Sequence, residues 1–361
     1  MKQRGDLAAT RTDLALVPPL GEASILITGG TGSFGSRFVE TVLRRYRPRR
    51  LVVFSRDEQK QYELAQKLDH EQGRSLRFFI GDVRDANRLE MAMRGIDYVV
   101  HAAALKHVPA AEYNPFECIK TNVNGAENVV RAALRTGVKR VIALSTDKAA
   151  NPINLYGASK LAADKIFVAA NNLSGKGETR FSVVRYGNVL GSRGSVVPLF
   201  ERLIREKAAS LPITDERMTR FWITLNQGVD FVLSSLAMMH GGEIFVPKIP
   251  SLKVVDLARF MAPGMPTRTV GIRPGEKLHE VLITTDDART TIELPDRYII
   301  EPAFAFWSRE HYEKSGARPV AEDFCYASNT NGRWLDLADF KRFMADENNS
   351  KAERPSRGAG A

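Results

Sequence analysis

The chain has 361 residues, of which 43% are hydrophobic and 26% charged, as expected for a globular protein with one large α/β domain and a smaller lobe. Lysine and arginine exceed aspartate and glutamate by ten, which indicates either a solvated, charged surface or an attraction for polyanionic ligands. The basic residues are dispersed and no recognition motif occurs, so we expect no nucleic-acid partner.

The sequence also argues against a metal site, a membrane anchor and secretion. The two cysteines, Cys118 and Cys325, form no metal-binding pair, and the six histidines show no ligand spacing. No apolar run approaches the roughly 20 residues of a membrane helix. The N-terminus lacks the apolar core of a signal peptide. We therefore expect a cytoplasmic protein with no membrane partner.

Short β-rich runs alternate with helical patterns from residue 24 onwards. The patterns predict strands at 24–28, 51–55, 76–80, 97–101, 140–145 and 181–186. They predict helices at 33–45, 58–70, 86–94, 115–136 and 156–172. Residues 51–54 and similar runs are apolar throughout, as expected for strands that helices cover on both faces. This alternation predicts an α/β fold with a doubly wound parallel sheet.

The chain divides into four predicted segments. Residues 1–22 are polar and contain proline, which indicates a flexible extension. Residues 23–186 carry the alternating pattern, and 187–345 are expected to form mainly a substrate lobe, with one or two strands returning to the main sheet. Helices in this lobe are predicted near 196–209, 226–239 and 253–262. Residues 346–361 are polar with glycine and proline, which predicts a disordered tail.

A glycine-rich turn follows the first strand. Gly29, Gly32 and Gly35 have the spacing G-x-x-G-x-x-G between a predicted strand and a predicted helix. Glycines permit a tight turn and close approach of a pyrophosphate, and the helix N-terminus supplies N–H groups. A purely structural turn is the alternative, but the second strand comes at the distance that a dinucleotide site requires. The predicted dinucleotide contacts here are Gly29, Thr31, Gly32, Ser33, Phe34 and Gly35.

The end of the second strand is expected to select the dinucleotide. NAD sites usually place an acid there, whereas arginine accommodates the 2′-phosphate of NADP. Ser55, Arg56 and Lys60 favour NADP, and Asp57 is the contrary feature. Arg56 as a solvated loop residue is the alternative.

Three further positions follow the third and fourth strands. Asp82 is placed to accept a hydrogen bond from an adenine amino group, with Val83 beside it, although a turn or N-cap role explains Asp82 equally well. Small residues at Ala102 and Ala103 would let a dinucleotide lie flat over the sheet, and core packing is the alternative. Lys106 is placed either to face a substrate or to point into solvent.

Residues 145–160 carry two acid/base pairs. Tyr156 and Lys160 have i, i+4 spacing on one helix face. A nearby cation lowers the pKa of a tyrosine, which can then take a hydroxyl proton while a hydride leaves the same carbon. Asp147 and Lys148, at the end of the preceding strand, form a second pair that simple alcohol oxidation does not need. Asp147 as a turn cap and Lys148 as a solvated side chain are the alternative.

Together these residues resemble the extended short-chain dehydrogenase/reductase superfamily, and within it the inverting UDP-N-acetylglucosamine 4,6-dehydratases of pseudaminic acid biosynthesis. The resemblance covers nearly all of residues 24–340. Its most specific part is Thr146-Asp147-Lys148, because the commoner retaining sugar dehydratases carry Asp-Glu there. The resembling segments are 27–35, 55–58, 79–85, 101–108, 143–160, 184–189, 218–223, 242–248 and 271–280.

This resemblance implies a Rossmann sheet of the extended type and NADP that is recycled within each turnover. It implies UDP-GlcNAc as substrate, a C5-inverted 6-deoxy-4-keto sugar nucleotide as product, and a homo-oligomer, dimeric or higher. Catalytic roles carry over to Thr146, Asp147, Lys148, Tyr156 and Lys160. Substrate contacts carry over to Lys106, Asn188, Val189, Arg273 and Glu276, although the Arg-Pro-Gly-Glu segment is equally explained as a structural turn.

The implied mechanism makes two demands on the second pair. Lys148 removes the C5 proton, which requires a depressed pKa, and Asp147 protonates the departing C6 hydroxyl, which requires a raised pKa. An exchange of these two roles stays open, as does the group that reprotonates C5. Three other functions also stay open: a C4 epimerase, a retaining dehydratase and a nonenzymatic NADP-binding regulator.

Overall fold

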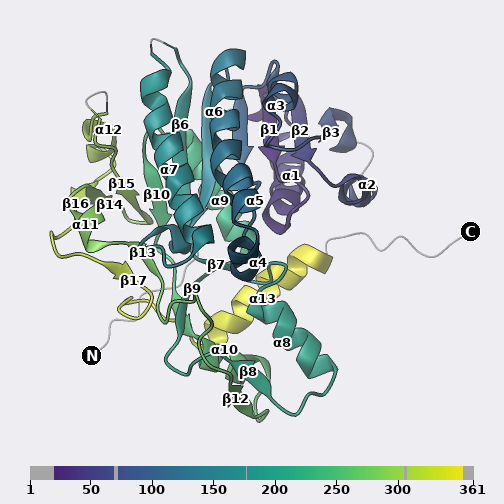
Figure 1. Cartoon of the computed structure of the whole chain (residues 1–361), viewed down its shortest axis with the longest axis vertical. Helices are drawn as coiled ribbons and strands as arrows, with labels where there is room; N and C mark the ends of the chain where they lie inside the picture. Colours follow the sequence, from purple (N-terminus) through teal and green to yellow (C-terminus); the bar gives the residue numbers. More distant parts are fainter. Residues whose placement is uncertain (1–19, 69–71, 176, 305–306, 353–361) are drawn as a thin grey trace, which may run out of the picture.

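The structure is a computed structural model that describes residues 20–68, 72–175, 177–304 and 307–352. Helices cover a large central sheet, and a smaller lobe lies at one end of it (Figure 1).

Within the described residues the main sheet has ten strands, in the order β16-β14-β15-β10-β6-β5-β4-β1-β2-β3. All six predicted strands form, each within one residue of its predicted bounds, and they run parallel. The strand order reverses between β1 and β4, and ligands bind at the carboxyl ends of strands at such a point. The prediction of a doubly wound parallel sheet is confirmed. The six strands are β1 (Ser24–Thr28), β2 (Arg50–Ser55), β3 (Leu76–Ile80), β4 (Tyr98–His101), β5 (Arg140–Thr146) and β6 (Arg180–Tyr186).

Helices pack on both faces of these strands. On one face α3 (Ala86–Met93), α6 (Gly125–Thr136) and α7 (Leu155–Leu173) pack side by side. On the other, α1 (Ser33–Tyr46) packs against α9 (Leu225–Met238). Figure 1 shows α6 and α7 in front of the strands and α9 behind them. Because both faces are covered, every residue of β1 is buried, which explains the uninterrupted apolar run at 25–27.

The helix predicted at 115–136 is interrupted. It consists of α5 (Pro115–Ile119), a π-helical turn at 120–124 and α6, and an unpredicted helix α4 (Val108–Tyr113) precedes it. The Asn122 amide in the π-helical turn donates to the carbonyl of Leu105 at 2.9 Å and to the hydroxyl of Ser159 at 2.9 Å. The irregular turn thereby ties the loop after β4 to α7. The sequence pattern stays helical throughout, so it cannot reveal the π-helical turn.

Four strands from the second half of the chain rejoin the main sheet, where one or two were predicted. The first, β10 (Ile244–Pro247), is parallel to β6, and antiparallel pairing adds the other three beyond it. These strands are two to four residues long, which is too short for a clear alternating pattern. The other three are β14 (Thr291–Glu293), β15 (Arg297–Ile300) and β16 (Arg318–Pro319).

The lobe has its own apolar core, which includes Phe200, Trp222 and Leu257. The helices predicted near 196–209 and 253–262 form as α8 (Val196–Arg205) and α10 (Val254–Met261). The remaining elements are α2 (Glu58–Lys67), α11 (Thr285–Ala288), α12 (Glu310–Glu313), β7 (Asn188–Val189), β8 (Leu211–Ile213), β9 (Thr219–Ile223), β11 (Ser251–Lys253), β12 (Thr267–Thr269), β13 (Val281–Ile283) and β17 (Tyr326–Ala327).

The two ends of the described chain depart from the predicted segments. Helix α13 (Leu337–Ala352) lies between the main sheet and the lobe (Figure 1), so the predicted disordered tail is wrong for 346–352. Phe340 and Phe343 of this helix join the core of the lobe, which stabilises it against the polar composition of its end. Residues 353–361 of the predicted tail and residues 1–19 of the predicted extension lie outside the described residues. Leu20, which the prediction placed in the extension, is buried in the main core. None of the described helices is long and apolar enough to cross a membrane.

Candidate active site

A cavity of about 820 Å³ opens along the carboxyl ends of the parallel strands. Residues of both the main sheet and the lobe line it, among them Gly29, Trp222 and Arg273. Every cofactor-binding, catalytic and substrate-binding residue predicted from the sequence lines this cavity except Asp147, which is fully buried. The fold thus brings the predicted residues to one place, although they are spread from 29 to 276 along the chain.

The glycine-rich turn forms a cradle at one end of the cavity. Gly29 has a φ of +66°, and a Cβ there would lie 2.8 Å from the backbone nitrogen of Ala103. A Cβ at Gly35 would lie 2.4 Å from the carbonyl oxygen of Gly29, so a larger residue would displace the turn. Gly32 is the N-cap of α1 and has no side chain to bond the first N–H groups of the helix. These groups fit a pyrophosphate of a dinucleotide.

Asp57 and Lys60, which follow β2, are paired with each other. The carboxylate of Asp57 accepts the backbone N–H of Lys60 at 3.0 Å, which caps α2, and contacts the Lys60 ammonium at 2.6 Å. Arg56 makes only a 3.5 Å contact with Asp82, and its side chain is 55% exposed. Asp82 accepts the backbone N–H of Arg84 at 3.0 Å, so the turn role left open for it is observed.

Tyr156 and Lys160 lie in the first turns of α7, and both are buried. The ammonium of Lys160 donates to the carbonyl of Leu144 at 2.7 Å. Burial raises the pKa of Tyr156 to about 12, although the charge of Lys148 and a hydrogen bond with Thr146 oppose this rise. Burial also lowers the pKa of Lys160. The predicted lowering of the pKa of Tyr156 is therefore wrong for this structure, because burial outweighs the nearby charge.

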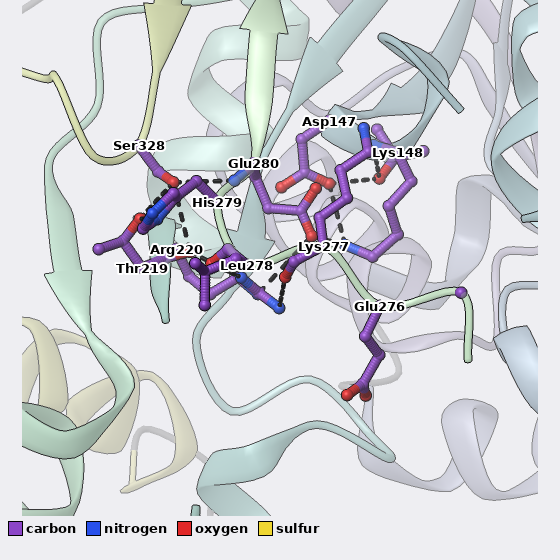
Figure 2. Close-up of polar contacts among 12 residues, drawn as sticks. Asp147, Lys148, Thr219, Arg220, Glu276, Lys277, Leu278, His279, Glu280 and Ser328 are labelled. Carbon is purple, nitrogen blue, oxygen red and sulfur yellow. Dashed lines mark hydrogen bonds and ion pairs between the residues drawn. The ribbon is translucent and has the colours of Figure 1, made fainter. Parts of the chain in front are cut away.

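Asp147 and Lys148 lie in a short 3-10 turn directly after β5, and a second carboxylate joins them (Figure 2). Nζ of Lys148 lies 3.0 Å from Oδ1 of Asp147 and 3.3 Å from Oε1 of Glu280. The hydroxyl of Thr146 also donates to Oδ1 of Asp147, at 2.9 Å. Lys148 and Asp147 thus point toward each other, and the alternative of a solvated lysine beside a turn cap does not describe them.

Burial and charge set the protonation of this cluster. Burial raises the pKa of Asp147, the charge of Lys148 opposes it, and Glu280 adds to the rise, which agrees with the prediction. Burial by itself would lower the pKa of Lys148, but Asp147 and Glu280 more than offset this and raise it above its ordinary value. The predicted depressed pKa of Lys148 is therefore wrong, because the sequence did not reveal that a second carboxylate contacts the ammonium.

All of the predicted substrate contacts line the same cavity. Nζ of Lys106 donates to the carbonyl of Arg193 at 3.1 Å, and burial lowers the pKa of Lys106. Asn188 and Val189 form strand β7. Arg273 and Glu276 close a turn, in which the N–H of Glu276 donates to the carbonyl of Arg273 at 3.1 Å. Figure 2 shows the carboxylate of Glu276 pointing away from Asp147 and Lys148. The structural role left open for this turn is thus observed for Glu276.

Sequence reasoning missed four charged residues that line the cavity: Arg193, Arg220, Lys277 and Glu280. Nε of Arg220 lies 3.6 Å from Oε1 of Glu280, and the ammonium of Lys277 donates to the carbonyl of Ala150. Lys277 and Glu280 lie within the resembling segment 271–280, but no spacing rule connects them to residues 145–160. No group of ligating side chains suited to a metal ion occurs among the described residues.

A family model described as "Polysaccharide biosynthesis protein" matches residues 25–302 of the chain. The chain belongs to this family. This family consists of extended short-chain dehydrogenase/reductase enzymes. The superfamily predicted from the sequence is therefore confirmed. The chain is 55% identical over 316 residues to a UDP-N-acetylglucosamine 4,6-dehydratase (inverting) of Campylobacter jejuni, and the match covers 86% of this chain and 94% of that protein. The resemblance to the inverting dehydratases is thereby confirmed.

Other members of the family and its structural neighbours carry related names. A UDP-glucose 4-epimerase of Rickettsia conorii is 40% identical over 331 residues, covering 90% of this chain and 95% of that protein. The X-ray structure of Pen from Bacillus thuringiensis matches with a TM-score of 0.82 and 36% identity over 91% of this chain and 99% of that chain. DesIV, a dTDP-glucose 4,6-dehydratase from Streptomyces venezuelae with NAD bound, shares the fold at a TM-score of 0.66 and 22% identity, covering 91% of this chain and 97% of that chain.

Proposed function

We propose that this protein is a C5-inverting UDP-GlcNAc 4,6-dehydratase. It converts UDP-GlcNAc to UDP-2-acetamido-2,6-dideoxy-β-L-arabino-hex-4-ulose by internal hydride recycling and supplies the first step of pseudaminic acid biosynthesis. The observation that carries the proposal is the ion pair between Lys148 and the buried Asp147, which lies at the strand ends together with Tyr156 and Lys160. The 55% identity to a named inverting dehydratase supports the same conclusion.

We propose NADP as the cofactor, and when bound it supplies the hydride acceptor and donor of the reaction. The glycine cradle and the free N–H groups of α1 would hold its pyrophosphate. Lys60 engages the carboxylate of Asp57, which leaves the exposed guanidinium of Arg56 available for a 2′-phosphate. These contacts favour NADP over NAD.

The first proton transfer belongs to Tyr156. Its phenolate takes the C4 hydroxyl proton and becomes the phenol, and the buried Lys160 ammonium, which donates to the carbonyl of Leu144, favours the phenolate that this step needs. Burial holds the pKa of Tyr156 near 12. The phenolate is therefore favoured only when a positive charge lies close to the phenol oxygen.

The elimination of water uses the second pair. Moving one proton along the 3.0 Å hydrogen bond from Lys148 to Asp147 produces a neutral amine and a neutral carboxylic acid together. This proton transfer leaves the net charge of the buried site unchanged. Nζ of Lys148 then removes the C5 proton, which the C4 ketone has made acidic, and Asp147 protonates the departing C6 hydroxyl. Once the hydride has been returned to C6, a proton added to C5 from the opposite face inverts that carbon.

A C4 epimerase is the second candidate, because the Rickettsia epimerase is 40% identical over most of the chain. An epimerase needs Tyr156, Lys160 and the dinucleotide but does not need to remove a C5 proton. The Asp147–Lys148 pair would then have no chemical task, so the dehydratase is favoured.

We also propose a cytoplasmic homo-oligomer, dimeric or higher. Four large apolar side chains are exposed on α4, α5 and the loop before α7, and a partner copy would remove them from water. They are Tyr113, Phe116, Ile119 and Ile153.

The test is to incubate the purified protein with UDP-GlcNAc in deuterated water and follow the reaction by proton NMR. We expect a 6-deoxy-4-keto product with the L-arabino configuration and deuterium at C5. A D-xylo product that appears first would make the enzyme a retaining dehydratase. Formation of UDP-GalNAc without loss of water would make it an epimerase, and no reaction with added NADP would refute the proposed substrate.

A further inference from the structure

Glu280 is a buried carboxylate that the mechanism above leaves without a role. It is 1% exposed and directly precedes β13. Its backbone is tied to Ser328 in both directions: its N–H donates to the Ser328 hydroxyl at 2.9 Å, and its carbonyl accepts the Ser328 N–H at 2.8 Å. These bonds fix where the side chain begins, so the carboxylate has little freedom to leave the cluster (Figure 2).

Arg220 of β9 holds the same carboxylate from the other side. Nε of Arg220 lies 3.6 Å from Oε1 of Glu280, while its two terminal nitrogens donate to the carbonyls of Leu278 and Lys277 at 3.1 and 2.9 Å. A guanidinium carries several donors in a rigid plane, so one side chain can fix both the loop and its carboxylate. Arg220 is itself buried, which strengthens its charge interaction with Glu280.

The ammonium of Lys148 is therefore shared by two buried carboxylates. Oδ1 of Asp147 and Oε1 of Glu280 both contact it, at 3.0 and 3.3 Å. The remaining oxygens, Oδ2 of Asp147 and Oε2 of Glu280, are buried without a hydrogen-bond partner among the described residues. A second buried carboxylate costs desolvation that a simple ion pair would avoid, so its retention in the site calls for a function.

We propose that Glu280 is a positioning residue that fixes the Lys148 ammonium beside Asp147 and, through its negative charge, keeps the shared acid/base proton on the Asp147–Lys148 pair. This inference rests on the proposed dehydratase and deepens it. It holds whichever member of the pair acts as acid, because the charge of Glu280 favours proton retention by both.

The effect of Glu280 on proton binding has a defined direction. A negative charge within a few ångströms raises the pKa of both a carboxyl and an ammonium, and Glu280 acts this way on Asp147 and on Lys148. The pair titrates together, so its two apparent pKa values set the two limbs of the pH–rate profile. The charged and titratable groups that face this pair from the surrounding elements are Lys106, Tyr156, Arg220, Lys277 and Glu280.

The experiment compares wild-type protein with Glu280→Gln, which keeps the size of the side chain and removes its charge. We expect both limbs of the kcat profile to move to lower pH, by about 1 to 3 on the pH scale, the usual effect of a charge at this distance. On the alkaline limb, a tenfold lower proton affinity lowers kcat about tenfold at fixed pH, and the loss is regained on acidification. The KM for UDP-GlcNAc stays close to the wild-type value, because Glu280 acts on the proton and not on binding.

Glu243→Gln is the matched control. Glu243 is fully buried and accepts hydrogen bonds from Ser182 and Tyr312, but it precedes β10, at the amino-terminal end of a strand parallel to β6, whereas the cluster lies at the carboxyl ends. We expect this variant to lose stability without moving either limb. If Glu280→Gln does not fold, Arg220→Gln replaces it and removes a positive charge from the cluster, so that the limbs move to higher pH.

Three results would overturn the inference. If neither limb of the kcat–pH profile moves in a folded Glu280→Gln or Arg220→Gln variant, Glu280 has only a structural role. A loss of turnover beyond about 1,000-fold at every pH would make Glu280 itself a reacting group, since removing one such group costs about that much. If the limbs of the kcat–pH profile move equally in Glu243→Gln, general destabilisation of the protein causes the shift. Failure of the proposed function is separate, because wild-type protein would then form no 4-keto product.

Discussion

Replacing Lys148 by methionine is the perturbation that tests the buried cluster most directly. Methionine keeps much of the side-chain volume but leaves the carboxylates of Asp147 and Glu280 facing each other without their shared cation. Removing one partner of a buried ion pair costs about 3 to 5 kcal/mol. We expect Lys148→Met to lose about this much stability near pH 8, together with the water-eliminating activity.

The loss of stability in Lys148→Met depends on pH, and its direction follows from the number of protons that the folded state binds. Without the ammonium, one carboxyl has a folded-state pKa raised above its unfolded value, so the folded state binds more protons. The destabilisation is therefore greatest at high pH and shrinks as pH falls, by up to about 1.4 kcal/mol per pH unit, until the ordinary carboxyl pKa is reached. In wild-type protein this dependence is weaker, because the charge of Lys148 opposes the rise in the pKa of Asp147 and lowers the pKa of Glu280.

The assay is urea unfolding followed by circular dichroism at pH 8 and pH 5.5, with Lys248→Met as control. Lys248 is as exposed as Lys148, with 25% of its side chain accessible in both cases, but its partner Glu293 is half exposed. An ion pair of this kind contributes about 0.2 to 1 kcal/mol, so the control loses little stability at either pH. An equal, pH-independent loss in both variants would refute the reasoning, as would normal dehydration by Lys148→Met.

The remaining predictions concern the other parts of the cavity. Tyr156→Phe should fold normally but lower kcat by about 100- to 10,000-fold, with no reduction of the nicotinamide on addition of UDP-GlcNAc; substantial residual reduction would argue against Tyr156 as the base. Gly35→Ala should lower the free energy of unfolding by about 1 to 3 kcal/mol and abolish dinucleotide binding, because its Cβ would lie 2.4 Å from the Gly29 carbonyl. Unchanged binding in a calorimetric titration would contradict the proposal that the glycine-rich turn holds the dinucleotide. Arg56→Ala should weaken NADP binding by about 10- to 100-fold and leave NAD binding nearly unchanged, since a charged hydrogen bond contributes about 1.5 to 3 kcal/mol; equal losses for both dinucleotides would remove the argument for NADP.

Local patterns determined the parallel half of the fold. The six runs from 24 to 186 became strands within one residue of their predicted bounds, because all but the edge strand β3 are largely buried and their neighbours in sequence form the covering helices. The glycine spacing and the Tyr156–Lys160 spacing likewise depend on one turn and one helix. Such features need no knowledge of distant segments.

Only the tertiary structure decided the short strands beyond β6 and the helix α13. Strand β16, for example, has two residues, and pairing with β14 defines it rather than its own sequence. The polar end of α13 does not predict a helix, yet contacts with the lobe place it.

The protonation of Asp147 and Lys148 most clearly separates what the sequence predicts from what the tertiary structure decides. From the sequence, Asp147 is the only partner assigned to Lys148, and the proposed role of Lys148 as a base requires a depressed pKa. Glu280 reaches the ammonium from a loop far along the chain, and Arg220 from another strand. The residue types and their order determined which chemistry is present, but the electrostatic balance depends on distances between segments that only folding brings together.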